Sequence, residues 1–82
     1  MPTVLREGRF RVLIYLPPCE HEPPHVHVWS AGGEVVIDLA VGTKPQTIRS
    51  VAGMRTADIT AAFHLVERHT AHLLQCWRKY HD

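Results

Sequence analysis

This sequence has few cysteines and aromatic residues, no long apolar run and almost no excess of one charge. It has two cysteines, 7% aromatic residues and a formal net charge of +1 over 82 residues. Two cysteines cannot form the disulfide framework of a small secreted domain. No apolar run approaches the roughly 18 residues that a membrane-spanning helix needs. The even charge balance does not predict a protein that binds nucleic acid through bulk charge.

The length allows one domain, residues 1–82, with a thin hydrophobic core. It excludes a dinucleotide-binding fold, a barrel enzyme and a kinase, all of which need longer chains. The N-terminal residues lack the basic and then apolar pattern of a secretory signal. We therefore expect a cytoplasmic protein with no membrane partner.

Charge and histidine are distributed unevenly along the chain. Residues 1–16 carry a net charge of +2, residues 17–43 carry −4 and residues 44–55 carry +3. Seven histidines occur, three of them in the acidic centre and four near the C-terminus. Because histidine titrates between about pH 5 and 8, the net charge should rise steeply on acidification.

The hydrophobic pattern predicts a series of strands followed by a helix. Alternating or β-branched runs favour strands at 2–6, 10–16, 25–29 and 34–39, and a weaker strand at 47–51. An apolar stripe of helical spacing runs from 57 to 80, and Thr56 is a suitable N-cap. At 1.5 Å per residue this helix would be about 36 Å long. The predicted fold is α+β, with an antiparallel sheet of four to five strands packed on one long C-terminal helix.

The predicted hairpin at 25–39 has one aliphatic face and one chemically rich face. A four-residue loop at 30–33 pairs Trp29 with Glu34, whereas a two-residue Gly32-Gly33 loop pairs Trp29 with Val36. Both loops give the same two faces, because side chains alternate along a strand. The aliphatic face, expected to pack on the helix, comprises Val26, Val28, Val35, Ile37 and Leu39. The other face comprises His25, His27, Trp29, Glu34, Val36 and Asp38.

Three interpretations of the second face remain open from the residues alone. Imidazole and carboxylate groups can pair as opposite charges on a solvated sheet. They can perform acid–base chemistry, as in a metal-independent ribonuclease, with the candidates His21, His25, His27 and Asp38. The histidines His21, His25 and His27, with or without Cys19, can instead bind zinc or copper. No other cofactor is expected.

Arginine is the main basic residue, and its positions leave two roles open. Seven of the nine basic residues are arginine, whose guanidinium fork suits phosphate and carboxylate groups. The candidates for phosphate or partner contact are Arg6, Arg9, Arg11 and Arg49. Arginines on an edge strand also oppose aggregation, so a purely protective role is the alternative.

A doubled proline lies between three histidines in the run His21-Glu22-Pro23-Pro24-His25-Val26-His27-Val28. This run resembles the signature of a family of short bacterial proteins, domain of unknown function 4160. Residues 1–6 and the segment from Leu65 to Tyr80 are similar to the opening and the closing helix of that family. Its signature residues correspond to His21, Pro23, Pro24, His25 and His27 here.

The family has no established activity, and its members are often one half of a toxin–antitoxin-like pair of genes. The resemblance implies a small component of such a module, which engages a small cognate protein or RNA through the His-rich face. Exposed sheet edges also favour pairing with a second copy of the chain.

Overall fold

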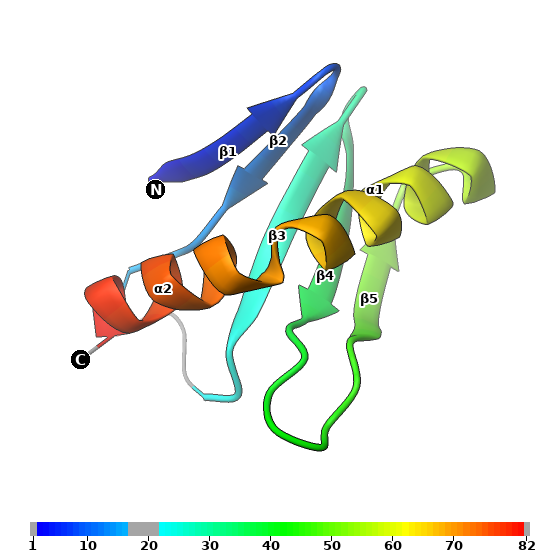
Figure 1. Ribbon diagram of the computed structural model, residues 1–82. Coiled ribbons are helices and arrows are strands. Elements are labelled where there is room, and N and C mark those ends of the chain that lie inside the picture. The colour runs from blue at the N-terminus through cyan, green and yellow to red at the C-terminus, as the bar shows by residue number, and fades with distance from the viewer. Residues whose placement is uncertain (1, 17–21, 82) are drawn as a thin grey trace.

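The computed structural model describes residues 2–16 and 22–81. Within them, five strands form one antiparallel sheet in chain order: β1 (Thr3–Glu7), β2 (Phe10–Leu13), β3 (His25–Ser30), β4 (Gly33–Asp38) and β5 (Thr47–Ala52). Two helices, α1 (Thr56–Arg68) and α2 (Thr70–His81), follow and cross one face of the sheet (Figure 1). The predicted α+β class and antiparallel sheet are confirmed, and the weak fifth strand is present.

The central hairpin has the register that a four-residue loop predicts. Trp29 lies opposite Glu34, and the pairing continues one step further to Ser30 and Gly33. Residues 31–32 alone therefore form the turn, with φ values of 50° and 80°. A two-residue type I′ turn requires positive φ at both positions. All five residues of the predicted aliphatic face are buried in the core, as their alternation requires.

The core lies between the sheet and the two helices. The helices contribute fully buried side chains at positions that include Ala62, Leu65, Val66, Leu73 and Trp77. Of the residues predicted to cover the aliphatic face, Val66 and Leu73 are buried. Ile59 and Phe63 pack against the core while remaining partly exposed. The predicted apolar stripe thus faces the sheet, and it is continuous across both helices.

The prediction of one long C-terminal helix is wrong. α1 ends at Arg68 and α2 begins at Thr70. His69 between them leaves the helical conformation, with φ −117° and ψ 21°. The Thr70 hydroxyl contacts the Val66 and Glu67 carbonyl oxygens at 3.3 and 3.1 Å. A straight helix of about 36 Å would be longer than the largest dimension of the domain, 33 Å. The break allows both halves to lie on the sheet.

Side chains of β1 hold this helix junction in place. Glu7, at the end of β1, forms an ion pair with Arg68. The other oxygen of the same carboxylate lies 3.2 Å from His69 Nε2. These contacts join residues about sixty positions apart in sequence. No local pattern of glycine or proline marks the junction, so its position depends on the tertiary structure.

Two element boundaries also differ from the prediction. β2 ends at Leu13 rather than at residue 16. The N-cap of α1 is Arg55 rather than Thr56, and it forms no side-chain cap hydrogen bond. Asp58 in the first helical turn is buried and pairs with Arg55 and with Arg9. A carboxylate at this position also interacts favourably with the helix dipole.

A Val26→Asp substitution tests the face assignment. Val26 is 0% exposed, so an aspartate there would bury a charge without a partner. We expect the free energy of unfolding, measured by urea denaturation, to fall by about 3 kcal/mol or more. Val51→Asp is a matched control, because Val51 pairs with Val35 on the same face but is 45% exposed. Equal losses in the two variants would contradict the assignment.

Candidate functional site

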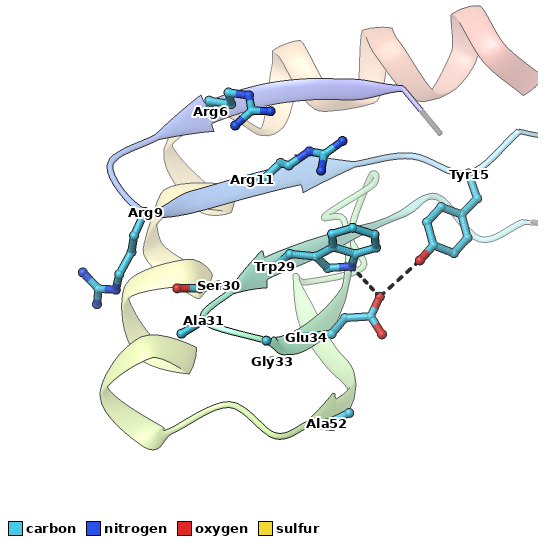
Figure 2. Close-up of a pocket in the computed structure, with 11 residues that line it drawn as sticks. Arg6, Arg9, Arg11, Tyr15, Trp29, Ser30, Ala31, Gly33, Glu34 and Ala52 are labelled. Carbon is cyan, nitrogen blue, oxygen red and sulfur yellow. Dashed lines mark hydrogen bonds between the residues drawn. The ribbon is translucent and has the colours of Figure 1, made fainter.

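One row of side chains crosses the sheet on the face away from the helices. The strand registers place Arg6 opposite Arg11, Arg11 opposite Trp29, Trp29 opposite Glu34, and Glu34 opposite Ala52. Residues directly opposite each other share a face, so this row runs over all five strands. Figure 2 shows these side chains on the near side of the sheet, with the helices behind it. We call these five residues the cross-strand row.

The cross-strand row lines an open hollow of about 580 Å³. Arg9 from the β1–β2 turn, Tyr15 after β2 and the turn at 30–33 complete its lining (Figure 2). The hollow therefore brings together three of the four arginines predicted to contact phosphate. Arg49 lies elsewhere, on β5, where it pairs with Asp38 at 2.7 Å.

Two of the three arginines of the hollow, Arg9 and Arg11, are oriented by neighbouring groups. Arg11 Nε donates to Thr3 Oγ1 at 2.7 Å, and its guanidinium carbon lies 5.4 Å from the centre of the Trp29 ring. Arg9 pairs with the buried Asp58, yet its side chain is 58% exposed. The Arg9 hydrogen bond outweighs the effect of burial and holds the pKa of Asp58 below its ordinary range. Fixed and accessible guanidinium groups of this kind suit the recognition of phosphate.

Glu34 is the anionic group of the hollow. Its Oε2 atom accepts hydrogen bonds from Trp29 Nε1 and His27 Nδ1, both at 2.9 Å, and from the Tyr15 hydroxyl at 3.4 Å. Burial raises the pKa of Glu34, but hydrogen bonds from Trp29, His27 and Tyr15 outweigh it and hold the pKa below its ordinary value of 4.5. Glu34 is therefore a carboxylate at neutral pH, an acceptor with no proton to donate.

The two described histidines of the signature, His25 and His27, are buried next to the hollow. His25 is 1% exposed and His27 is 8% exposed, so the interpretation as a solvated pair is wrong for both. The His27 ring stacks on Tyr15, with centroids 4.0 Å apart. His25 Nδ1 donates to the Pro23 carbonyl at 2.8 Å. The predicted pairing of imidazole with carboxylate does occur, between His27 and Glu34.

A continuous series of rings leads from the hollow to the end of α2. Behind Tyr15 and His27, His25 lies 5.6 Å from His27 and 5.0 Å from Trp77, between ring centroids. Trp77 stacks on His81 at 3.6 Å, and its Nε1 donates to Glu22 at 3.1 Å. The C-terminal helix thus packs directly against the residues of the signature.

The remaining predicted ligands are not brought into one described site. Asp38 lies opposite His25 in the register, and its carboxylate pairs with Arg49. Over 2–16 and 22–81, no group of three histidine, cysteine, aspartate or glutamate side chains is arranged to hold a metal ion. Cys19 and His21 lie outside the described residues, so the binding of zinc or copper by His21, His25 and His27 stays a prediction.

Three side chains that are central to the hollow, Trp29, Glu34 and Tyr15, are not among the site residues predicted from the sequence. Glu34 was placed on the correct face, but Asp38 was preferred as the carboxylate partner of the histidines. The sequence did contain a signal for Glu34, because the register of a four-residue loop pairs it with Trp29. Tyr15 was assigned only to the far end of a strand. Its contact with Glu34 depends on a turn of the chain after Leu13 that no local pattern specifies.

Comparison with known proteins places the chain in a family. The model of the family called Domain of unknown function (DUF4160) matches residues 10–78. The chain belongs to this family, as its resemblance implied. No curated protein and no solved structure matches it. None of the helices in the described residues is both long enough and apolar enough to cross a membrane.

Acid sensitivity follows from the lowered pKa of Glu34. The carboxylate stabilises the fold above pH 4.5, and this contribution is lost as the pH falls through the folded-state pKa. Replacing Glu34 by Gln should therefore lower the free energy of unfolding at neutral pH, with the difference shrinking below pH 4.5. Urea denaturation at a series of pH values measures this. The control is Glu67→Gln, because Glu67 is 62% exposed. A difference for Glu34→Gln that does not change with pH would contradict the prediction.

Proposed function

We propose that this chain binds single-stranded RNA in the arginine-lined hollow, as the small component of a toxin–antitoxin-like two-gene module. The observation that carries the proposal is the convergence of Arg6, Arg9 and Arg11 with Trp29 and Tyr15 in one hollow. Guanidinium groups bind phosphates, and flat aromatic or guanidinium surfaces stack on unpaired bases. The family resemblance supplies the two-gene context.

The architecture supports RNA as the ligand. An antiparallel sheet with helices on one face leaves the other face free for a strand of RNA to lie across. Here the helices cover one face, and the cross-strand row occupies the other (Figures 1 and 2). Leu13, His27 and Val36 on that same face are buried, so on β2, β3 and β4 the accessible part lies around the hollow. The expected contact is a short segment of a few nucleotides.

Local charge supports an anionic ligand although the net charge is only +1. Arg6 and Arg11 outnumber the one carboxylate of the hollow, Glu34, while the third arginine of its lining, Arg9, pairs with Asp58 of α1. An electrostatic field of this kind acts within about a Debye length, roughly 8–10 Å. It therefore attracts phosphate at the hollow without making the whole protein basic.

The burial of the described histidines supports binding rather than cleavage. Acid–base catalysis requires an imidazole nitrogen within hydrogen-bond reach of the reacting hydroxyl or phosphate. His25 is almost completely buried, and His27 directs Nδ1 to Glu34 with its ring covered by Tyr15. His27 positions Tyr15 and Glu34, and His25 packs between His27 and Trp77.

Removal of the arginines should weaken RNA binding. We expect the Arg6→Ala, Arg11→Ala double variant to bind a labelled single-stranded RNA at least about tenfold more weakly, measured by fluorescence anisotropy. The slope of log K against log salt should fall by about 1 for each arginine removed. Arg49→Ala is the matched control, because Arg49 is an arginine on the same sheet outside the hollow.

The outcomes separate RNA from an acidic protein partner. Equal loss of RNA affinity in Arg49→Ala and in the double variant would show that the hollow has no special part. Absence of RNA binding, together with arginine-dependent binding of the protein encoded by the neighbouring gene, would replace RNA by a protein ligand. Either result contradicts the proposal.

A further inference from the structure

We infer that the hollow selects guanine among the RNA bases, and that Glu34 reads its Watson–Crick edge. The inference rests on the proposed function, because it assumes that RNA occupies the hollow. It starts from an apparent conflict: a carboxylate repels phosphate, yet Glu34 lies among the arginines that would bind phosphate. A group of that charge is useful there when it forms a specific contact with a base.

The order of side chains across the sheet matches the order of groups in a nucleotide. From β1 to β4 the cross-strand row presents two guanidinium groups, then an indole ring, then a carboxylate. Adjacent strands are about 4.8 Å apart, so Arg11 and Glu34 are separated by about 10 Å along the row. A phosphate over β1 and β2 therefore places its base over Trp29 and Arg11. The far edge of that base then points to Glu34.

Space and a flat surface are available along this path. Trp29 is half-buried, and the Arg11 guanidinium lies against its ring. Guanidinium planes and indole rings both stack on bases. Beyond Glu34 the row ends in Ala52, the smallest side chain of the five, which leaves the carboxylate open on that side (Figure 2).

The carboxylate of Glu34 is held in a single orientation. Three donors, Trp29, His27 and Tyr15, converge on Oε2. All three of these hydrogen bonds leave Oε1 without a side-chain donor in the described part of the chain, and Glu34 lines the hollow. Oriented acceptors discriminate between ligands, because a partner must present its donor in one direction.

The chemistry of the bases then favours guanine. A carboxylate can only accept hydrogen bonds. Guanine presents two neighbouring donors on its Watson–Crick edge, the N1–H and the exocyclic N2 amino group. Adenine, cytosine and uracil each present a ring nitrogen or carbonyl acceptor next to their donor, and an acceptor there repels the carboxylate. Because Oε2 already accepts three hydrogen bonds, Oε1 accepts from both guanine donors, and we expect this shared contact to discriminate against the wrong base by about tenfold.

Pentanucleotides with a uridine background and one variable central base test the inference. We expect the pentamer with central guanine to bind the wild-type protein about tenfold more tightly than those with adenine, cytosine or uracil. Central inosine, which keeps N1–H but lacks the 2-amino group, should lose most of this preference. Fluorescence anisotropy of end-labelled pentamers gives all five affinities.

The variant Glu34→Gln should separate base reading from a merely structural role. In this variant the ratio of the affinities for the central-guanine and all-uridine pentamers should fall to about one. This ratio is the readout, because Glu34 also accepts hydrogen bonds from Trp29, His27 and Tyr15, so its replacement changes the overall affinity as well. Tyr15→Phe is the matched control, because it removes one hydrogen bond to Oε2 and keeps both the ring and the carboxylate. It should retain the preference. A residue that only braces Trp29 would instead weaken all pentamers equally when replaced by glutamine.

The failure of this inference differs from the failure of the proposed function. Equal affinity for all five pentamers, with binding still dependent on Arg6 and Arg11, would overturn guanine selection and leave RNA binding intact. Absence of binding to every pentamer would refute both. If Glu34→Gln does not fold, the comparison of guanine with inosine on the wild-type protein decides, because it changes only the ligand.

Discussion

A single carboxylate oxygen, Oε2 of Glu34, brings side chains from β3, β4 and the segment after β2 into one set of hydrogen bonds. It connects β3 through Trp29 and His27, the segment after β2 through Tyr15, and β4 through its own backbone. His27, the aromatic side chains Trp29 and Tyr15, and the one acidic group that lines the hollow among residues 2–16 and 22–81 therefore share one set of hydrogen bonds. Their relative positions follow from the β3–β4 register, which places Trp29 opposite Glu34.

This arrangement gives the family signature a structural meaning. The described histidines of the signature are buried ring donors rather than a solvent-facing reactive pair. His27 directs its donor to Glu34, and His25 fills the space between β3 and Trp77 of α2. The doubled proline places the Pro23 carbonyl where His25 can donate to it. The side chains that a ligand in the hollow can contact are the arginines, Trp29 and Glu34.

Alternation along the strands made much of the fold predictable. It assigned Val26 and Ile37 to the core and Trp29 and Glu34 to the other face, because that assignment does not depend on loop length. The features that escaped prediction depend on contacts between distant residues. The pairing of Arg9 with Asp58 joins positions 49 apart. The helix break at His69 reflects the size of the sheet, and no residue pattern encodes that size. Glu34, and not Asp38, is the carboxylate that pairs with His27. This depends on neighbouring segments, because Asp38 pairs with Arg49 of β5 and Glu34 accepts a hydrogen bond from Tyr15 after β2.

The contact of Glu7 with the junction between the helices links the two sides of the domain mechanically. Glu7 follows Arg6 in β1, and its carboxylate holds Arg68 and His69 on the opposite layer. Tension on the arginine side of this outermost strand is therefore transmitted through one residue to the point where α1 meets α2. Since a close-packed interior transmits strain, the face that carries the hollow and the helical face respond to load as one body.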